Sequence, residues 1–272
     1  MYDSRVERQF GTRHGEIRVI QVDIEGTGPP LVLVHSLLTD SAAFDLVAPT
    51  LALRRTVVRV SLPGFGTTSP LDAPEPTIFD LAEVVAEALD LADVGTDAAV
   101  LGNGFGAFVV VALAIAHGDR FGDLIVANGG ASFSPERKVA FTTMSNLVSE
   151  SGMEAVVDVA VRRIFTDAYL EVNPEVIDER RAVLVKTDPA AFAASCRALR
   201  DMDLREHAAT ITNRTLVIAG GADGTTPPEM SQDLAGRIPG ATYVELADCG
   251  HCPPLEKPDL FIQEIERFLG AK

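Results

Sequence analysis

Cysteine is scarce in this chain of 272 residues, and the few cysteines show no pairing pattern. Cys196, Cys249 and Cys252 are odd in number and give no disulfide framework of the kind that holds small secreted domains together. The run from Cys249 to Cys252 has the spacing of a metal site, but no second Cys or His pair elsewhere completes a ligand set. The cysteines therefore predict a reducing compartment and no structural metal.

Basic residues and long hydrophobic runs are also few. Lys and Arg number 23 against 39 Asp and Glu, which gives a net charge of −16. Nucleic acids and anionic membranes bind proteins through basic faces, so this balance argues against both as partners. No apolar run reaches the roughly 18–20 residues of a transmembrane helix, and Met1 to Arg8 carry no hydrophobic segment of a signal peptide. We therefore expect a cytoplasmic protein.

Apolar residues make up 47% of the chain, which is enough for one large core. They fall into short aliphatic runs that predict strands, and most of these runs are followed by a helical pattern. The expected strands are 15–22, 31–34, 56–61, 98–101, 124–127, 215–220 and 242–246, and the main expected helices of this series are 42–53, 76–91, 108–116 and 258–269. The alternation predicts an α/β fold with a mainly parallel central sheet flanked by helices, which binds ligands at the carboxyl ends of its strands.

The strand pattern disappears from about Ser132 to Thr210. Four helical segments take its place, separated by Gly, Pro and Asn residues: 134–151, 153–165, 173–187 and 189–200. A block of helices that interrupts a series of strands and helices is typical of an inserted cap. The predicted domains are a core made of residues 1–131 and 211–272 and a helical cap made of residues 132–210.

The segment Gly102-Asn103-Gly104-Phe105-Gly106 follows an aliphatic strand and precedes a buried helix. This is the layout of a nucleophile elbow, in which a strained turn lifts the serine of a G-x-S-x-G motif to the top of a sheet. Here Gly104 stands at the serine position, so an acyl-enzyme cannot form there. The segment also fails the G-x-G-x-x-G spacing of a dinucleotide-binding loop, so we expect no nucleotide cofactor.

Two further loops that directly follow strands carry an acid and a histidine. Asp223 comes after the strand 215–220, and His251 comes after the strand 242–246. An acid that bonds one ring nitrogen of a histidine fixes its tautomer, so that the other nitrogen can act as a base. Asp248 is a rival for the role of the acid, but its place three residues before His251 is better explained by a turn.

Five separated motifs share the order and spacing of the landmarks of one superfamily. They are Val34-His35, Leu62 to Gly66, the elbow, Gly220 to Asp223 with Thr226-Pro227, and Gly250-His251. In these motifs the chain resembles the α/β-hydrolase superfamily over essentially its whole length, with the triad order of elbow, acid and histidine. The loop from His35 to Asp40 and a cap that ends near Leu204 look most similar to the 3-oxoadipate enol-lactonase branch.

This resemblance implies roles for particular residues. His251 looks like the catalytic base and Asp223 like the acid that orients it, with Gly104 at the nucleophile position. The implied oxyanion hole consists of the backbone N–H groups of Leu37 and Phe105, which need no particular side chain. The implied fold is the α/β-hydrolase fold, with the helical cap inserted after the strand 124–127.

Four other side chains are candidates for contact with a substrate. Ser36 could present its hydroxyl near the oxyanion hole, although capping of its own loop is the simpler role. Asn103, Phe141 and Phe165 are the other candidates, the two phenylalanines as parts of an apolar cap surface. These residues suit a small to medium, partly apolar organic molecule, which we expect as a partner. We expect no cofactor and no bound metal.

Four functions are compatible with a glycine at position 104. In the first, which we favour, Asp223 and His251 act together as a general base on a water molecule or on an acidic C–H bond, and Gly104 makes room for that water or substrate. The reaction is then hydrolysis of an activated ester or lactone without a serine nucleophile. Its non-hydrolytic variant is proton transfer, lyase chemistry or cofactor-free oxygenation.

The other three functions assume different origins of the glycine. In one, Gly104 replaces the serine of a hydrolase in an inactive or engineered form. In another, the chain is a pseudoenzyme that binds a small apolar ligand under its cap. In the last, Ser36 or a cap residue such as Ser132 supplies the missing hydroxyl. Retention of both Asp223 and His251 favours chemistry over binding alone, since a receptor needs neither residue.

Overall fold

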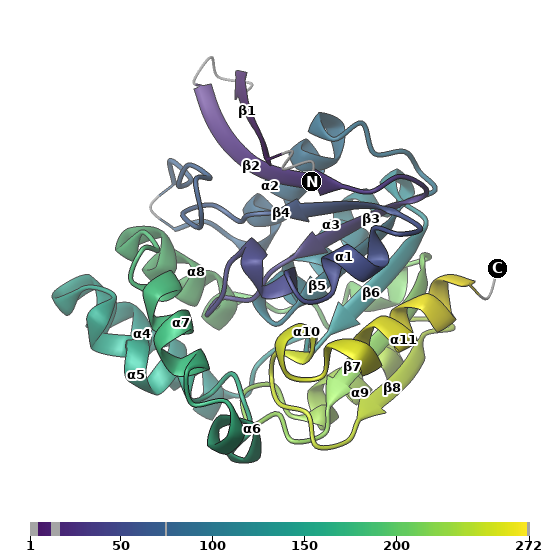
Figure 1. Cartoon of the computed structure of the whole chain (residues 1–272). Coiled ribbons are helices and arrows are strands. Elements are labelled where there is room, and N and C mark those ends of the chain that lie inside the picture. Colours follow the sequence, from purple (N-terminus) through teal and green to yellow (C-terminus); the bar gives the residue numbers. More distant parts are fainter. Residues whose placement is uncertain (1–4, 12–16, 74, 271–272) are drawn as a thin grey trace.

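An eight-stranded sheet runs through the centre of the molecule in the order β1-β2-β4-β3-β5-β6-β7-β8, within the residues that this computed structural model describes, which are 5–11, 17–73 and 75–270 (Figure 1). The strands are β1 (Arg5–Gly11), β2 (Ile17–Glu25), β3 (Pro30–Val34), β4 (Thr56–Val60), β5 (Ala99–Asn103), β6 (Asp123–Ala127), β7 (Arg214–Gly220) and β8 (Thr242–Leu246). The six strands β3 to β8 are parallel, whereas β2 pairs antiparallel with β4 and β1 pairs antiparallel with β2. The predicted α/β fold with a mainly parallel sheet is confirmed.

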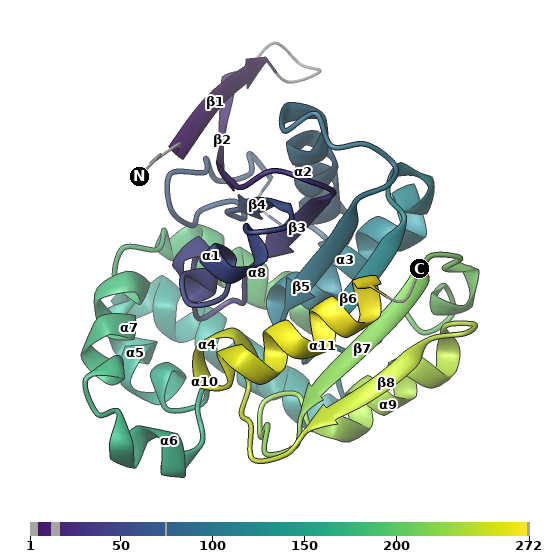
Figure 2. The same cartoon turned by 45° about the vertical axis from the view of Figure 1, so that its right-hand side comes forward.

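Helices cover both faces of this sheet (Figure 2). One face carries α1 (Ala48–Leu51) and α11 (Pro258–Gly270), and the other carries α2 (Ile78–Leu91), α3 (Phe105–His117) and α9 (Pro228–Arg237). Successive side chains of a strand point to opposite faces, so Leu31 and Leu33 pack with the first group, while Val32 and Val34 pack with the second. A strand buried on both faces needs apolar residues at every position, which explains the uninterrupted aliphatic run of β3.

The parallel pairing brings the loops that carry the motifs to one edge of the sheet. These loops follow β3, β5, β6, β7 and β8, and they begin at His35, Gly104, Asn128, Gly221 and Ala247. Because the carboxyl ends of parallel strands all lie at the same edge, the residues of these loops can meet although they are up to about two hundred positions apart in sequence.

The helical cap lies over this edge of the sheet (Figure 1). It contains α4 (Pro135–Ser151), α5 (Glu154–Val161), α6 (Asp167–Val172), α7 (Val176–Leu184) and α8 (Pro189–Asp201). Its two ends are joined, since Ser132 pairs with Asp203 in an antiparallel bridge and the Leu204 N–H donates to the Ala131 carbonyl at 2.8 Å. The chain therefore returns to the core at Leu204, before the expected limit at residue 210.

Several elements differ from the sequence-based expectation. The helix expected over 42–53 is a 3₁₀ turn (Ser41–Phe44) followed by the single turn of α1, because Pro49 has no N–H and its ring excludes a helix that continues from the preceding residues. Helix α6 was not expected, and it begins where the Thr166 hydroxyl accepts a hydrogen bond from the Tyr169 N–H at 3.2 Å. In the strand expected over 15–22, Gly15 and Glu16 lie outside the described residues.

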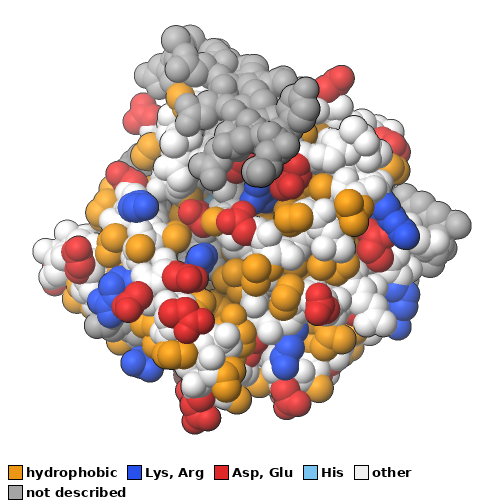
Figure 3. Space-filling model, in the orientation of Figure 1, with side chains coloured by type: hydrophobic (Ala, Val, Ile, Leu, Met, Phe, Trp, Pro, Cys, Tyr) orange, Lys and Arg blue, Asp and Glu red, His pale blue; other side chains and the backbone are white. Residues whose placement is uncertain are grey.

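One face of the molecule shows how its acidic side chains are distributed. On the face seen in Figure 3, Asp and Glu side chains lie scattered among hydrophobic ones. In the described part of the chain, the helices are all too short or too polar to cross a membrane.

Candidate active site

Gly104 forms the turn between β5 and α3 with φ 56° and ψ −115°. This backbone conformation strains any residue with a Cβ, and it is the strained turn that an elbow requires. The Gly104 N–H donates to the Ala127 carbonyl at 2.9 Å, and the Gly106 N–H donates to the His35 carbonyl at 3.0 Å. A Cβ at position 106 would collide with the carbonyl oxygens of Val34 and His35, so this glycine is required for close approach of the helix to β3. The turn between β5 and α3 thus has the backbone conformation of an elbow, with a glycine at its centre.

The space next to Gly104 is already filled by two other side chains. A Cβ added to Gly104 would lie 2.6 Å from His251 Nε2, 2.9 Å from Ser36 Cβ and nearer still to Ser36 Oγ, whereas real Cβ atoms essentially never have neighbours within 3.0 Å. From the sequence, we expected a water molecule or the substrate in this space. The structure places the Ser36 hydroxyl and the His251 ring there instead.

His251 and Asp223 form a hydrogen-bonded pair behind this space. His251 Nδ1 lies 2.8 Å from Asp223 Oδ2, and both side chains are buried. The N–H groups of Thr225 and Thr226 donate to Asp223 Oδ1 at 2.7 and 3.1 Å, and the Thr226 hydroxyl donates to Oδ2 at 2.6 Å. Asp248, the rival acid, lies exposed in a turn with φ 52°. The structure therefore pairs the histidine with Asp223.

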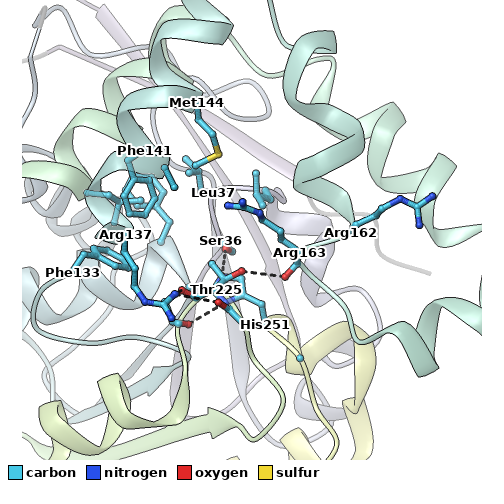
Figure 4. Close-up of a pocket in the computed structure, with 18 of the residues that line it drawn as sticks. Ser36, Leu37, Phe133, Arg137, Phe141, Met144, Arg162, Arg163, Thr225 and His251 are labelled. Carbon is cyan, nitrogen blue, oxygen red and sulfur yellow. Dashed lines mark hydrogen bonds between the residues drawn. The ribbon is translucent and has the colours of Figure 1, made fainter. Parts of the chain in front are cut away.

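The surroundings of Asp223 favour its charged form. Burial by itself raises the pKa of this carboxyl, but the charge and hydrogen bond of His251 and the hydrogen bonds from Thr226 outweigh it. The pKa of Asp223 therefore lies below its ordinary value of 3.8. A carboxylate at Nδ1 keeps the proton of His251 on that nitrogen and leaves Nε2 free to accept one. His251 Nε2 faces Ser36 and the cavity (Figure 4).

The backbone of the His251 loop is held from two sides. The His251 N–H donates to the Ile164 carbonyl of the cap at 2.9 Å, and the Gly250 N–H donates to Glu256 Oε2 at 2.7 Å. Glu256 also accepts hydrogen bonds from the N–H and the hydroxyl of Thr166, at the start of α6. The cap and the loop of the base are thus connected through one buried carboxylate.

Asn103 does not contact the cavity, which corrects the expectation that it touches substrate. Its buried side-chain nitrogen donates to the carbonyls of Ala127 at 3.3 Å and His251 at 3.1 Å, and its oxygen accepts from the Cys252 thiol at 3.4 Å. All its polar atoms are used to fix the loop of His251 on the elbow. The residue type at the second position of a G-x-S-x-G motif does not show whether its side chain faces the protein interior or the substrate.

The peptide between Ser36 and Leu37 is fixed by hydrogen bonds to the Ser36 carbonyl. His35 Nδ1 donates to it at 2.8 Å, and the N–H and hydroxyl of Thr39 donate at 3.2 and 3.1 Å. His35 Nε2 accepts from the Leu62 N–H at 3.0 Å, which fixes the tautomer. Burial lowers the pKa of His35, so its ring is neutral near pH 7. His35 therefore braces this loop.

Two residues that line the cavity have backbone N–H groups without a hydrogen-bond partner in the described part of the chain. A trans peptide directs its N–H away from its C=O, so the fixed Ser36 carbonyl also fixes the direction of the Leu37 N–H. Within the described residues, neither this N–H nor that of Phe105, at the first turn of α3, has a hydrogen-bond partner. Both residues line the cavity. They can serve as the two donors of an oxyanion hole, and the positive end of the α3 dipole adds to their effect.

The cavity between cap and core has a volume of about 790 Å³. Ser36 and His251 lie at its base, and Phe133, Phe141 and Met144 from the cap form one wall (Figure 4). Phe165, stacked on Tyr169 with ring centroids 5.0 Å apart, forms part of another wall. Both predicted phenylalanine contacts thus line the cavity.

Three arginines at this cavity have no signal in the sequence pattern. The Arg137 guanidinium donates to the carbonyls of Gly224 at 3.2 Å and Thr225 at 2.8 Å, so it ties α4 to the loop of Asp223. The side chain of Arg163 is directed into the cavity, whereas that of Arg162 is directed away from it (Figure 4).

The sequence profile of the alpha/beta hydrolase family matches residues 31–264. This chain belongs to the alpha/beta hydrolase family. The pimeloyl-(acyl-carrier protein) methyl ester esterase of Aliivibrio salmonicida is 28% identical, over 90% of this chain and 94% of that protein. The 3-oxoadipate enol-lactonase 1 of Acinetobacter baylyi is 27% identical, over 95% of each protein. The crystal structure of the enol-lactonase from Burkholderia xenovorans superimposes on this chain with a TM-score of 0.89, over 97% of this chain and all of that one. The two sequences are 30% identical.

These similarities confirm the superfamily that the order of the motifs predicted. The relatives act on ester and lactone bonds, as their names state. In this alpha/beta hydrolase, burial raises the pKa of the Cys252 thiol to about 12 and also raises the pKa of Cys249. Neither thiol beside the site is therefore a thiolate near pH 7. Among the described residues, no cluster of three or more His, Cys, Asp and Glu side chains could hold a metal ion.

Proposed function

We propose that this alpha/beta hydrolase cleaves the ester or lactone bond of a small, partly apolar organic molecule, with His251 as general base. The observation that carries the proposal is the contact of 2.8 Å between His251 Nδ1 and the buried Asp223 carboxylate. Nε2 of this histidine lies at a cavity that Leu37 and Phe105 also line, and the N–H groups of these two residues have no hydrogen-bond partner in the described part of the chain. A base and an oxyanion hole at one point are the two groups that acyl transfer needs in addition to its nucleophile.

The chemistry follows from these positions. The carbonyl oxygen of the substrate lies between the N–H groups of Leu37 and Phe105, which stabilise the negative charge that develops there. His251 Nε2 takes the proton of the attacking hydroxyl group, and Asp223 stabilises the imidazolium that results. The same nitrogen then gives this proton to the oxygen of the leaving group. In the simplest form the attacking group is a water molecule, which suffices for esters with good leaving groups and for enol-lactones.

The class of substrate follows from the cavity and from the relatives. A volume of about 790 Å³ with aromatic walls suits a small organic molecule rather than a polymer. A methyl ester esterase and an enol-lactonase are similar to this chain over at least nine-tenths of its length. Both activities attack a carbonyl carbon bonded to oxygen, the reaction for which the base and the two N–H donors are arranged.

Hydrolysis of p-nitrophenyl acetate, p-nitrophenyl butyrate and an aryl lactone by the whole chain tests this proposal. We expect turnover in the wild type and a loss on the order of 10³-fold or more in kcat for His251→Ala and for Asp223→Asn. His207→Ala, at an exposed histidine outside the cavity, is the matched control and should leave the rate unchanged. The proposal is wrong if the wild type hydrolyses none of these compounds, or if His251→Ala hydrolyses them at the wild-type rate.

A further inference from the structure

We propose that Ser36 is the nucleophile of this enzyme, and that its Oγ forms the acyl-enzyme that Gly104 cannot form. The inference rests on the proposed function, because it requires His251 as the base. In this inference the group that first attacks the substrate carbonyl is the Ser36 hydroxyl and not a water molecule.

The Ser36 hydroxyl has the partner that a nucleophile needs. Its Oγ lies 3.3 Å from His251 Nε2, and His251 Nδ1 lies 2.8 Å from Asp223 Oδ2. The hydroxyl contacts the imidazole and the imidazole contacts the carboxylate, which is the arrangement of a catalytic triad. Within the described residues, the Ser36 hydroxyl has no other hydrogen-bond partner. The expected role of this serine, to cap its own loop, is wrong, because the Thr39 hydroxyl makes the hydrogen bonds to the Ser36 N–H and C=O.

Ser36 Oγ also lies where the side chain of an elbow nucleophile would lie. It is the atom nearest to a Cβ added at Gly104, and His251 Nε2 is the next nearest. A hydroxyl in that place is next to the base and at the floor of the cavity, which Ser36, Gly104 and His251 line together. The glycine is therefore required for the approach of Ser36, since any side chain at position 104 would displace it.

The backbone on both sides of Ser36 is fixed, so that only its side chain is free to turn. The N–H of Ser36 donates to Thr39 Oγ1 at 3.1 Å, and its carbonyl accepts from His35 and Thr39. The Leu37 N–H, one of the two oxyanion donors, directly follows Ser36 in the chain. A backbone N–H of the residue after the nucleophile is the usual first donor of an oxyanion hole in this fold. The Leu37 N–H follows Ser36 in this way, and the Phe105 N–H follows Gly104 in the same way.

The other hydroxyl groups of the cavity wall are committed elsewhere. The Thr226 hydroxyl donates to Asp223, the Thr225 hydroxyl donates to the Arg163 carbonyl at 3.2 Å, and the Thr166 hydroxyl bonds Glu256. Ser134 Oγ accepts the Arg137 N–H at the start of α4. Ser132, the other hydroxyl considered from the sequence, lies at the bridge to Asp203 and does not line the cavity.

The reaction balances without a further reagent. Ser36 Oγ forms a bond to the carbonyl carbon while its proton passes to His251 Nε2. The bond from that carbon to the leaving oxygen then breaks, and His251 returns the proton to this oxygen. A water molecule gives a proton to His251 and attacks the acyl carbon. The bond to Ser36 Oγ then breaks, and Oγ takes the proton back from His251, which restores the enzyme and releases the acid.

Covalent labelling of the whole chain with a fluorophosphonate tests the inference independently of the substrate. We expect one adduct, located by fragmentation on the tryptic peptide Val19–Arg54, at Ser36 and not at Ser41, Thr27, Thr39 or Thr50 of the same peptide. Ser36→Ala should abolish the adduct, as should His251→Ala. Ser41→Ala, which changes a serine of the same loop outside the cavity, should keep the adduct. Thermal melting of each variant shows that loss of labelling is not loss of folding.

Kinetics give the second readout. With p-nitrophenyl acetate, we expect a burst of about one p-nitrophenol per active site in the wild type and a loss of roughly 10²-fold or more in kcat/KM for Ser36→Ala. Absence of an adduct at Ser36, or a Ser36→Ala variant within about threefold of the wild type, overturns the inference. In either case, hydrolysis that still depends on His251 leaves the proposed function in place with water as the attacking group. An adduct at Ser36 in an enzyme that hydrolyses none of the esters supports the inference and contradicts the substrate class instead.

Discussion

Replacement of Gly104 by alanine is the sharpest test of how this site is built. The added Cβ would lie 2.6 Å from His251 Nε2 and 2.9 Å from Ser36 Cβ, so both side chains must move. The backbone at φ 56° and ψ −115° adds strain of about 1–3 kcal/mol for any L residue. Overpacking adds about 1–3 kcal/mol, so the expected loss in free energy of unfolding is roughly 2–6 kcal/mol.

Thermal unfolding followed by circular dichroism measures this loss. For a chain of this length, 1 kcal/mol lowers Tm by ~2 °C, so Gly104→Ala should melt roughly 4–12 °C below the wild type. Gly152→Ala is the matched control, because Gly152 also has a positive φ of 76° but an added Cβ would have nothing within 4 Å. This control carries the strain alone and should lose only about 1–3 kcal/mol.

Gly104→Ser shows whether the site has merely lost a serine. Since its Cβ overlaps the same two side chains, we expect lower stability and no gain in hydrolysis of p-nitrophenyl acetate. The double variant Ser36→Ala with Gly104→Ser removes the nearest overlapping atom and transfers the hydroxyl to the elbow. It should therefore be more stable than Gly104→Ser alone, which a double-mutant cycle quantifies. A Gly104→Ser variant with the Tm of the wild type and an esterase rate about 10²-fold higher would refute this reasoning.

Two further predictions concern His35. His35→Ala removes one of the donors that fix the Ser36 carbonyl. In this variant kcat should fall by about 10-fold to 10²-fold with little change in KM. A rise in KM alone would show that the loop does not set the oxyanion hole. Burial holds the pKa of His35 below 6.5, so below pH 6.5 the unfolded chain binds a proton that the folded chain does not, and stability must fall as the pH is lowered through this range. Urea unfolding at about pH 7.5 and about pH 5.5 measures this fall in the free energy of unfolding, which should be smaller in His35→Gln. An equal fall in the variant would mean that other titratable groups cause it. Asp223 acts in a separate, lower range, because its lowered pKa contributes stability that is present above 3.8 and lost only as the pH falls through the folded-state value.

The fold could be predicted because its signals are local and redundant. Strand β3 is aliphatic from Leu31 to Val34, as burial on both faces requires, and β5 and β6 are likewise buried at every position. The helix expected over 42–53 was wrong because one residue, Pro49, outweighed the apolar periodicity around it. Helix α6 was missed because its start depends on the Thr166 cap, a signal that also occurs in loops.

The site was predictable only in part, because the roles of its residues depend on contacts between loops that lie far apart in the sequence. Asp223 and His251 were predicted as a pair from their order after β7 and β8, and the structure brings them within 2.8 Å. The roles of Ser36 and Asn103 could not be read from their types, since both residues can bond backbone or substrate. Asn128 was missed, although it too directly follows a strand. Its buried side chain donates to the Gly250 carbonyl at 2.9 Å and accepts the Gly220 N–H at 2.6 Å.

The cap of this alpha/beta hydrolase does more than close the cavity. Ile164 accepts the N–H of His251, and Thr166 bonds Glu256, which in turn holds the N–H of Gly250. On the other side, Arg137 bonds two carbonyls of the loop that carries Asp223. The loops of the base and of its acid are therefore each fixed partly by the cap, and their 2.8 Å contact depends on where the cap lies.

This coupling makes the cap part of the catalytic scaffold. Under the proposed function, the face of the cap that lines the cavity recognises the substrate, while the residues beside it position His251 against Ser36. A misplacement of about 1 Å in a reacting group can cost on the order of 10²-fold in rate. Changes in the cap that widen the cavity therefore alter kcat together with KM unless they leave the segment from Ile164 to Thr166 in place. The proposed function therefore implies that the substrate range and the geometry of the base cannot vary independently.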